Sequence, residues 1–302
     1  MKAAFTTLFT LISVGVSAQD PFFTQYNYGW SMVNPAYAGS LACSRAEVGY
    51  RLQWVKSEGA PVTFNAAYDQ YTKFGGVGFN YLYDEIGLMK TNRFDFNYSY
   101  PLLLKTTKSE SGFVVQPGVQ VSYYLKQLDT AGLIFSGPVE TFDHVKRNVF
   151  DVSCGLLTYG KRLCFGLAVF HLTEPDEGFL GTSHLPRRFV MHASGIFGNA
   201  DPDENKLSVI PSVLVMRQGD FSMLVGMVNV KFYGINLGAG YRNQDALLFS
   251  AACTWRDITV SYSYDHSISE LSNYTNGSHE IHFGYRFMKD KWSQMRNLRQ
   301  FI

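Results

Sequence analysis

Strict alternation of apolar and polar residues recurs along almost the whole chain. In one segment Phe94, Phe96 and Tyr98 alternate with Asp95 and Asn97. A repeat of two residues is the pattern of a β-strand whose two faces differ. The same pattern, or a similar one, marks residues 45–54, 62–69, 77–83, 93–100, 115–126, 148–159, 162–170, 187–197, 206–216, 221–232, 235–242, 246–255, 258–265 and 280–287. The sequence therefore predicts an all-β fold of about fourteen antiparallel strands.

Composition and hydropathy limit the environments in which these strands can lie. Aromatic residues make up 16% of the chain and charged residues only 17%, and the net charge of +1 gives no reason to expect nucleic acid as a partner. No stretch after the N-terminus approaches the roughly 18 apolar residues of a membrane-spanning helix. In a membrane, a closed barrel is the other structure that satisfies its own backbone hydrogen bonds. A soluble β-sandwich also alternates, so alternation alone leaves both architectures open.

In a membrane barrel the aromatic face meets lipid and the polar face lines the lumen. We expect a lumen of mixed charge, to which Glu47, Arg188 and His192 contribute. The candidate lumen residues with the clearest pattern are Arg51, Asp69, Arg93, Asp95, Arg242 and Arg286.

The connections between the predicted strands favour the barrel. The longest ones, residues 127–147, 171–186 and 266–279, all follow odd-numbered strands and so lie at the same end. Residues 160–161, 233–234 and 256–257 form short turns at the other end, where 105–111 and 199–205 are longer exceptions. Outer-membrane barrels keep long loops outside and short turns in the periplasm. The pattern therefore predicts a transmembrane barrel over residues 44–287 with both termini periplasmic.

The two ends of the chain are of other kinds. Residues 1–18 have the positive start, apolar core and small-residue cleavage site of a signal peptide, and a lead-in segment of residues 19–43 follows. The apolar core is too short for a membrane anchor. Residues 288–302 form a basic tail with Lys289 and Arg296 among its four cations. We expect this tail in the periplasm, as an unstructured extension or a docking segment.

The lead-in segment is aromatic but not periodic. Residues 20–40 carry several aromatic side chains, and Asn34-Pro35 is a turn signal. Because exposing this apolar surface is unfavourable, we expect the segment to be ordered, at the periplasmic mouth or inside the lumen beneath the first strand. There Arg45, Arg51 or Arg93 could pair with Asp20. We hypothesise that the segment closes the pore.

The sequence contains few motifs that indicate catalysis, metal binding or cofactor binding. His279 and His282 are three residues apart, which places them on opposite faces of a strand and differs from the helical zinc-protease spacing. No nucleophile elbow, phosphate-binding loop or dinucleotide motif is present. We therefore predict no catalytic residue, metal or cofactor. Cys154 and Cys164 are hypothetical cross-strand neighbours, although thiols are the expected state of the four cysteines.

Several motifs resemble one family in order along the chain. The opening has the pattern DPxFxQY followed by NPAYAG, formed by Asp20, Pro21, Phe23, Gln25, Tyr26, Asn34, Pro35, Tyr37 and Gly39. Later landmarks are the Tyr-Arg-x-Gln-Trp motif at 50–54, Gly-x-Gly at 76–78, Tyr-Arg at 241–242, and 262–265 followed by 277–280. Together they resemble the PorP/SprF family of the type IX secretion and gliding machinery.

The resemblance implies a non-enzymatic protein of the cell outer membrane whose barrel is similar to the fatty-acid transporter barrels. Members of the family bind, deliver or anchor type IX cargo, such as surface adhesins, through a C-terminal sorting domain. Their other partners are the periplasmic ring, peptidoglycan-linked proteins and the translocon. We expect the loop of residues 266–279 to hold the partner, with candidate residues Asp265, Asn273, Tyr274, Gly277, His279 and Glu280.

Two other functional classes stay open at this stage. A polar lumen is equally expected of an outer-membrane channel or hydrophobic-solute transporter. An outer-membrane enzyme would need serine, histidine and an acid from different strands, which the sequence does not assemble.

Overall fold

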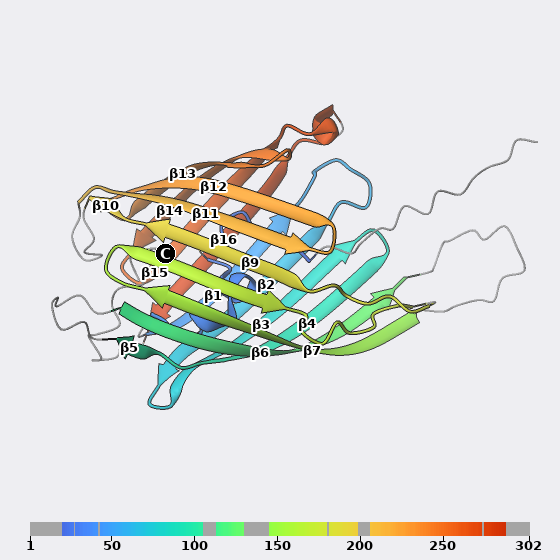
Figure 1. The fold of residues 1–302 in the computed structure, drawn as a ribbon. Helices are drawn as coiled ribbons and strands as arrows, with labels where there is room; N and C mark the ends of the chain where they lie inside the picture. The colour runs from blue at the N-terminus through green and yellow to red at the C-terminus, as the bar shows by residue number, and fades with distance from the viewer. Residues whose placement is uncertain are drawn as a thin grey trace, which may run out of the picture.

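Each predicted strand segment forms one strand of a closed antiparallel barrel, seen in the computed structural model (Figure 1). The structure describes residues 20–287 except 27, 42, 105–112, 130–144, 180, 199–205 and 274. Within these ranges, pairing of β9 with β11 closes a ring of fourteen strands. The strands of the ring are β1 (Ser44–Leu52), β2 (Val62–Thr72), β3 (Gly75–Ile86), β4 (Met89–Ser99), β6 (Phe113–Leu128), β7 (Val145–Tyr159), β8 (Leu163–Phe170), β9 (Arg188–Gly195), β11 (Ser208–Gln218), β12 (Phe221–Phe232), β13 (Ile235–Arg242), β14 (Ala246–Trp255), β15 (Ile258–Ser267) and β16 (Ser278–Phe287).

Short elements complete the described chain. β5 (Leu102–Leu104) pairs with β6, and β10 (Phe197–Gly198) pairs with β11. The helical turns are α1 (Trp30–Val33), η1 (Pro35–Tyr37) and η2 (Glu270–Asn273). No described helix has the length and apolar character needed to cross a membrane.

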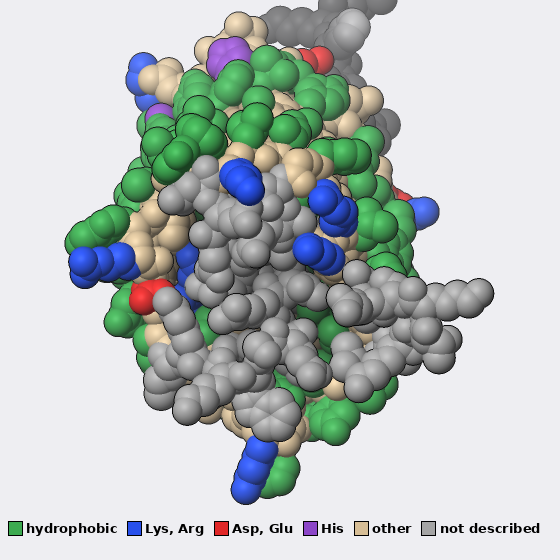
Figure 2. All heavy atoms as spheres, turned by 90° about the vertical axis from the view of Figure 1, so that its left-hand side faces the viewer, with side chains coloured by type: hydrophobic (Ala, Val, Ile, Leu, Met, Phe, Trp, Pro, Cys, Tyr) green, Lys and Arg blue, Asp and Glu red, His purple; other side chains and the backbone are tan. Residues whose placement is uncertain are grey.

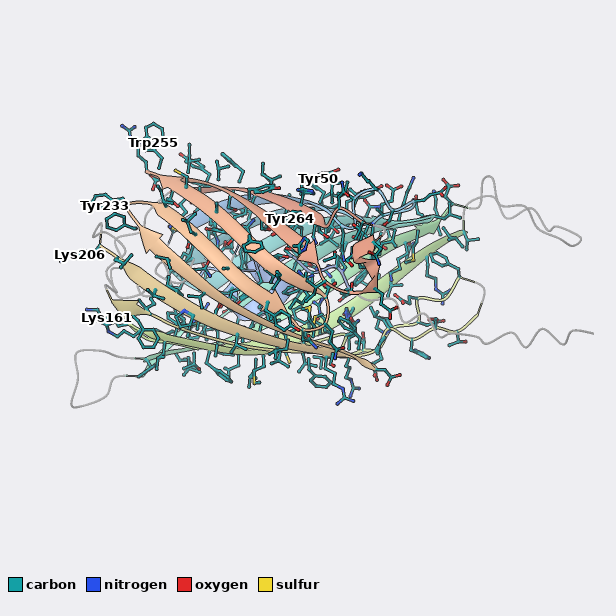
Figure 3. The ribbon with its side chains drawn as sticks, turned by 90° about the horizontal axis from the view of Figure 1, so that it is seen from above. Tyr50, Lys161, Lys206, Tyr233, Trp255 and Tyr264 are labelled. Carbon is teal, nitrogen blue, oxygen red and sulfur yellow. The ribbon has the colours of Figure 1, made fainter. Side chains whose placement is uncertain are left out.

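The facing of the side chains follows the alternation. Phe96 is 64% exposed on the outer face, whereas its neighbour Asp95 is 0% exposed inside the barrel. Side chains project outward along the whole barrel wall (Figure 3), and hydrophobic side chains cover its flanks (Figure 2). The prediction of a transmembrane barrel with an aromatic outer face is confirmed by this arrangement.

The two ends of the barrel differ. At the end that we call the turn end, β2–β3, β7–β8, β12–β13 and β14–β15 are joined by short turns, and β1 begins and β16 ends there. Lys161, Lys206, Tyr233 and Trp255 mark this end in Figure 3. The opposite end, the loop end, carries the connections 53–61, 171–187 and 268–277. Most of the remaining predicted long loop, 127–147, lies outside the described residues, as do the predicted signal peptide and residues 288–302.

Basic and aromatic side chains gather at the turn end. Figure 2 looks at this end and shows Lys and Arg side chains around its rim. Lys73 lies over the ring of Phe74, and Arg256 lies over the ring of Trp255, with 4.9 and 4.8 Å to the ring centroids. Aromatic rings beside basic groups are typical of a membrane–water interface.

The lumen wall is polar over only part of its circumference. Buried charged and amide side chains line β15, β16, β1 to β4, β6 and β7. The inner faces of β8, β9, β11, β12 and β14 instead carry apolar residues, including Val190, Leu214 and Val225, which form a hydrophobic cluster with Tyr26 and Val33 of the lead-in segment. On this side the inner face is therefore mainly apolar, contrary to the expected polar lining, although Arg188 and His192 of β9 lie inside the barrel as expected.

The register also fixes the positions of the cysteines. Cys164 pairs with Tyr159, and Cys154 pairs with Val169. The two cysteines are therefore not cross-strand neighbours, and that hypothesis is wrong. All four cysteines are outside disulfides, and Cys253 is exposed on the outer face.

Candidate functional site

The lead-in segment, residues 20–43, runs through the lumen from one end of the barrel to the other (Figure 1). At the loop end the backbone N–H of Asp20 donates to Oε1 of Gln218, the last residue of β11, at 3.3 Å. Towards the turn end the N–H of Gly39 donates to Oδ2 of Asp69 at 2.7 Å. The segment therefore lies inside the lumen, one of the two places predicted for it, and its first described residue, Asp20, is at the end opposite the start of the first strand.

Asp20 is held by a cluster of charged side chains, the Asp20 cluster, formed with His171, Arg188 and Asp151. Oδ2 of Asp20 lies 2.7 Å from Nε2 of His171 and 3.0 Å from Nη1 of Arg188. Nδ1 of His171 lies 2.8 Å from Oδ2 of Asp151. The predicted partners of Asp20 were wrong, because Arg45 pairs with Asp69, Arg51 with Asp265 and Glu280, and Arg93 with Asp95.

The Asp20 cluster shifts the pKa values of Asp20 and His171, the two members that lie outside the strands. Burial opposes the charge of Asp20, but His171 and Arg188 outweigh it and hold the pKa of Asp20 well below its usual value. Burial likewise opposes charge on His171, but Asp20 and the hydrogen bond with Asp151 outweigh it and raise the pKa of His171. Both shifts favour an ionised pair between the lead-in segment and the barrel wall.

A second group, the Thr24 cluster, fixes the next turn of the lead-in segment and consists of Thr24, Arg51, Arg242, Asp265 and Glu280. Nη1 of Arg51 and Nη2 of Arg242 each donate to Oγ1 of Thr24 at 2.9 Å. Thr24 Oγ1 donates to Oδ2 of Asp265 at 2.7 Å.

Glu280 binds the backbone at the same place. Its two carboxylate oxygens accept from the N–H groups of Thr24 and Gln25 at 2.8 and 2.9 Å, and it also pairs with Arg51 at 2.9 Å. All charged members of the Thr24 cluster are buried. Because an unpaired buried charge is costly, the cluster holds only while its opposite charges stay together.

The middle of the lead-in segment is packed by aromatic contacts. Trp30 of α1 is 1% exposed, and the guanidinium of Arg45 lies over its ring with 5.1 Å to the centroid. Tyr37 stacks on His192 with 5.4 Å between the ring centroids. These contacts bury aromatic side chains of the lead-in segment, which belongs to none of the predicted strands.

The Asn34-Pro35 turn lies directly on the barrel wall. Oδ1 of Asn34 accepts from the N–H of Ala36 at 2.9 Å, and its Nδ2 donates to the carbonyls of Leu156 in β7 and Leu167 in β8, both at 3.1 Å. The side chain of Asn34 thus hydrogen-bonds to backbone carbonyls of two neighbouring strands. A single amide side chain therefore accepts a hydrogen bond within its own turn and donates hydrogen bonds to the barrel wall.

Glycines in the wall make room for this turn. A Cβ on Gly118 would lie 2.5 Å from Cα of Ala36, and a Cβ on Gly155 would overlap Oδ1 of Asn34. Gly76 faces the carbonyl of Ala38 in the same way. The lead-in backbone can approach these strands only because side chains are missing there.

The structure places the sequence-predicted motif residues as follows. Phe23, Gln25, Tyr26, Asn34, Pro35 and Gly39 are buried, while Asp20, Pro21 and Tyr37 are partly buried. Among the lumen candidates, Arg51, Asp69, Arg93, Asp95 and Arg242 are buried inside the barrel, and Arg286 is partly buried at the turn end.

The partner-loop candidates separate into different places. Asp265 and Glu280 are buried in the Thr24 cluster and Gly277 is buried, so the expectation that they present a loop surface is corrected. Asn273 is exposed and His279 is partly exposed, with Nδ1 2.7 Å from the hydroxyl of Tyr262. Tyr274 lies outside the described residues.

Some residues of the site were not predicted from the sequence. Thr24, Asp151 and His171 hold the lead-in segment, and no local pattern distinguishes them. The inward glycines Gly118 and Gly155 had a usable signal, because glycine inside a strand indicates the close approach of another backbone. Within the described ranges no group of three or more His, Cys, Asp or Glu side chains is arranged to hold a metal ion.

Comparison with solved structures supports the architecture. The structure described as "CymD monoaromatic hydrocarbon channel" superposes with a TM-score of 0.51 and 12% identity, covering 86% of this chain and 93% of that one. At this identity the likeness concerns the fold alone.

Two further structures are similar at lower scores. The "TodX deltaS2S3 mutant monoaromatic hydrocarbon channel" gives a TM-score of 0.46 at 10% identity, with 84% of this chain and 91% of that chain covered. A Pseudomonas aeruginosa FadL homologue gives 0.42 at 9% identity, with coverages of 85% and 93%.

The sequence comparison is more specific. No curated protein matches the chain. The chain does match, over residues 15–285, the family described as "Type IX secretion system membrane protein PorP/SprF". A closed barrel with an apolar outer face and a membrane family of this kind place the protein in the cell outer membrane. Since the match spans nearly the whole barrel and its lead-in segment, the chain belongs to the PorP/SprF family of type IX secretion system membrane proteins.

Proposed function

We propose that this protein is a non-enzymatic component of the type IX secretion machinery that binds, delivers or anchors secreted cargo at the loop end of its barrel. The cargo's C-terminal sorting domain, or that of a surface adhesin, is the partner. The turn end then faces the periplasm, and the lead-in segment closes the lumen. The loop end faces the cell exterior.

The filled lumen is the observation that carries this proposal. The lead-in segment is tied at the loop end by the Asp20 and Thr24 clusters and lies against the wall strands towards the turn end through Asn34. A barrel filled in this way has no room for a protein chain to pass. Holding cargo at an end of the barrel is therefore the role that its geometry supports best.

The described loops at the loop end offer a prearranged surface for such a partner. The N–H of Val55 donates to the carbonyl of Gly277, and the N–H of Asn276 donates to the carbonyl of Val55, both at 3.0 Å. These bonds join two loops that are far apart in the sequence. Glu270 and Asn273 are exposed beside them and are our candidates for cargo contact.

The turn end is the proposed side for the periplasmic partners. Exposed basic residues there are Lys73, Lys161, Arg162, Lys206 and Arg256. We propose that the periplasmic ring, the peptidoglycan-linked protein and the translocon approach this side. A basic rim favours acidic surfaces on those partners.

Affinity purification from native outer membrane tests the proposal. The tagged protein should bring along type IX components and one or more secreted proteins. A Glu270→Ala/Asn273→Ala variant should lose the secreted proteins and keep the machinery. The matched turn-end variant, Lys161→Ser/Arg162→Ser, should keep the secreted proteins. Recovery of neither cargo nor machinery with the native protein would refute the proposal.

The alternative function is an outer-membrane channel or hydrophobic-solute transporter. It is favoured by the overall likeness to a barrel that is described as a channel. Conductance in planar lipid bilayers separates the two functions, because a barrel closed by its lead-in segment should conduct poorly. Deleting residues 20–39 should raise the conductance while the barrel still inserts. A high conductance of the native protein would favour the channel.

A further inference from the structure

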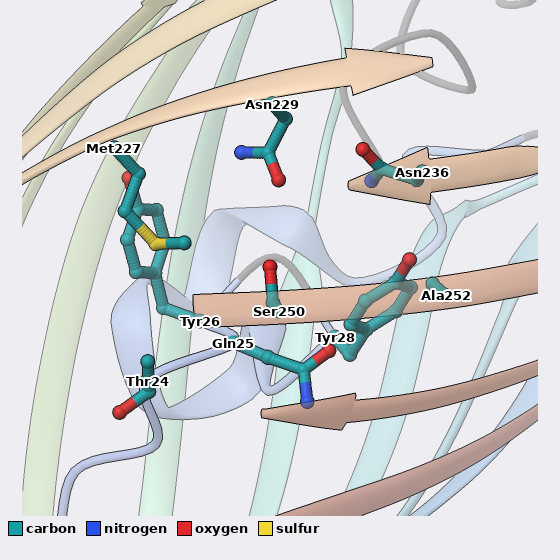
Figure 4. A pocket seen from close by; sticks show the side chains of 9 residues that line it. All are labelled: Thr24, Gln25, Tyr26, Tyr28, Met227, Asn229, Asn236, Ser250 and Ala252. Atoms are coloured by element: carbon teal, nitrogen blue, oxygen red, sulfur yellow. The ribbon is translucent and has the colours of Figure 1, made fainter. Parts of the chain in front are cut away.

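The space left beside the lead-in segment is too small to receive a partner. Figure 4 shows the space that Gln25 and Tyr28 border together with Asn229 and Ser250 of the wall. Its volume is about 10 Å³, which is room for a single water molecule at most. A peptide segment cannot enter this part of the lumen, so a site for one has to lie elsewhere.

Two cations lie side by side on the inner face of the wall near the loop end. Lys126 of β6 is paired directly with Arg147 of β7 in the register of the two strands. The alternation of both strands turns the two side chains towards the inside of the barrel. Like charges that face each other directly in a sheet repel, and partial burial makes the repulsion stronger. The two cations therefore need anions beside them.

The anions come from a hairpin in the connection between β8 and β9, residues 175–185, which we call the acidic hairpin. Oδ2 of Asp176 lies 2.6 Å from Nη2 of Arg147, and Glu177 pairs with Lys126. The side chains of Lys126 and Glu177 are each 9% exposed, whereas those of Arg147 and Asp176 are 42% and 31% exposed. The acidic hairpin thus covers one cation almost completely and leaves the other within reach of solvent.

Hydrogen bonds within the acidic hairpin make it one unit. Oδ1 of Asp176 accepts from the N–H groups of Gly178 and Ser183 at 3.0 and 2.9 Å. The N–H of Glu177 donates to the carbonyl of Ser183 at 2.8 Å. The two carboxylates are therefore presented to the two cations together.

The chain that leads into the acidic hairpin is strained. His171 and Glu174 have φ angles of 59° and 44°, in the left-handed region that residues with a side chain disfavour. Such strain persists only where contacts hold it, and it is common in segments that change conformation. Asp151 supplies contacts of this kind, to Nδ1 of His171 and to the hydroxyl of Thr173. The seated position of the acidic hairpin is therefore maintained by its contacts against a strained base.

We propose that Lys126 and Arg147 form a receptor site for an acidic peptide segment of the cargo, and that the acidic hairpin covers this site until the segment displaces it. Carboxylates of the segment replace those of Asp176 and Glu177 on the two cations, and the displaced carboxylates become hydrated. The exchange leaves no buried charge without a partner. This inference rests on the proposed function for the identity of the partner. It adds the charge of the segment that is recognised and the place where it binds.

Binding of a fluorescein-labelled hexaglutamate peptide to the purified barrel in detergent tests the cover. Asp176→Asn/Glu177→Gln should bind the peptide about tenfold more tightly than the native protein. The reason is that the peptide no longer competes with carboxylates of the same chain, whose effective concentration at the cations is high. An unchanged affinity in this variant would overturn the proposal.

A matched control separates this effect from a change in overall charge. Glu174→Gln/Glu270→Gln removes the same number of exposed or partly exposed carboxylates at the loop end, but Glu174 pairs with Arg187 and Glu270 lies in the connection 268–277. The control should change the affinity for the peptide less than twofold. Equal gains in the two variants would show a general charge effect and overturn the proposal.

Removing the cations provides the second test. Lys126→Gln/Arg147→Gln, made in the Asp176→Asn/Glu177→Gln background, should lose the tenfold gain. Both ion pairs are then replaced by neutral groups, so the variant leaves no buried charge unpaired, and heat-modifiable gel mobility checks its folding. Lys161→Ser/Arg162→Ser at the turn end, in the same background, should keep the gain. Tight binding that survives loss of Lys126 and Arg147, or that is lost in the turn-end variant, would overturn the proposal.

The recovery of cargo separates this inference from the proposed function. If the native protein brings along secreted proteins from native outer membrane but Asp176→Asn/Glu177→Gln raises neither their recovery nor the affinity for hexaglutamate, the inference fails and the proposed function stands. If the peptide binds as expected but the native protein brings along neither secreted proteins nor type IX components, the receptor site is supported and the proposed function fails.

Discussion

The carboxylate of Asp20 lies 2.7 Å from Nε2 of His171, across 151 residues of sequence, and so ties the start of the lead-in segment to the loop end of the barrel wall. Arg188 lies 3.0 Å from the same carboxylate oxygen. Because the imidazole is the weaker and titratable cation of the two, the strength of this tie depends on pH.

The tie should be strongest in weakly acidic solution. The raised pKa of His171 means that its contribution is complete below the ordinary value of 6.5 and is lost as the pH rises through the raised pKa. The lowered pKa of Asp20 means that its contribution is present above 3.8 and is lost as the pH falls through the lowered pKa. Hydrogen exchange of residues 20–26, corrected for intrinsic rates, should show most protection between these values.

The variant His171→Gln provides the control for this pH dependence. It keeps a side chain that can hydrogen-bond but removes the titrating cation. Protection of residues 20–26 should then lose its decline above the raised His171 pKa. An unchanged decline in the variant would assign the pH dependence to another group.

A second prediction concerns Gly118 of β6, which packs against the Asn34-Pro35 turn. Gly118→Ala places a methyl group 2.5 Å from Cα of Ala36, so that the lead-in backbone must move. Overpacking of this kind costs about 1–3 kcal/mol in the free energy of unfolding. Gly226→Ala is the control, because nothing lies within 4 Å of its added Cβ. Urea titrations of both variants in lipid vesicles measure the difference, and equal costs would contradict the contact.

The sequence predicted the wall of the barrel better than its contents. Phe96 points outward and Asp95 points into the barrel, because every second side chain of a membrane-spanning strand must be apolar to face lipid. Asp20 and His171 carry no such repeat, and their contact depends on the path of the lead-in segment through the closed lumen. Pairing partners at such separations cannot be read from local pattern, which is why Arg45, Arg51 and Arg93 were expected instead.

The apolar half of the inner wall was missed for a related reason. Met223, Val225 and Met227 face inward on β12, where Leu224 and Val228 face outward. A strand that is apolar on both faces shows no alternation and can only be recognised as buried on both sides. Here one side meets lipid and the other meets Tyr26 and Val33 of the lead-in segment.

A third prediction concerns depth in the membrane. Phe96 lies within the span of β4 and is 64% exposed, and Phe74 lies in the turn between β2 and β3 and is 69% exposed. Phe96→Arg should cost roughly 2–4 kcal/mol in folding free energy, whereas Phe74→Arg near the interface should cost roughly 0–1 kcal/mol. Reversible unfolding in lipid measures both. Equal costs would show that Phe96 does not face the hydrocarbon region.

The last prediction follows from the direction of the lead-in segment. Its first described residue, Asp20, lies at the loop end beside Gln218, while Gly39 lies near the turn end beside Asp69. An epitope placed directly before Asp20, after the predicted signal-peptide cleavage site, should therefore leave the barrel at the loop end. If the loop end faces the cell exterior, intact cells should bind an antibody against this epitope.

The same epitope inserted between Tyr233 and Gly234 is the matched control, because this turn lies at the opposite end of the barrel. It should be detected only after the outer membrane is permeabilised. Detection of the Tyr233 insertion alone in intact cells would mean that the barrel has the reverse orientation. If neither epitope is detected in intact cells, although both are detected in permeabilised cells, the lead-in segment does not deliver its start to the cell surface. The threading of residues 20–39 through the lumen would then be wrong, because only that path carries Asp20 away from the end at which β1 begins.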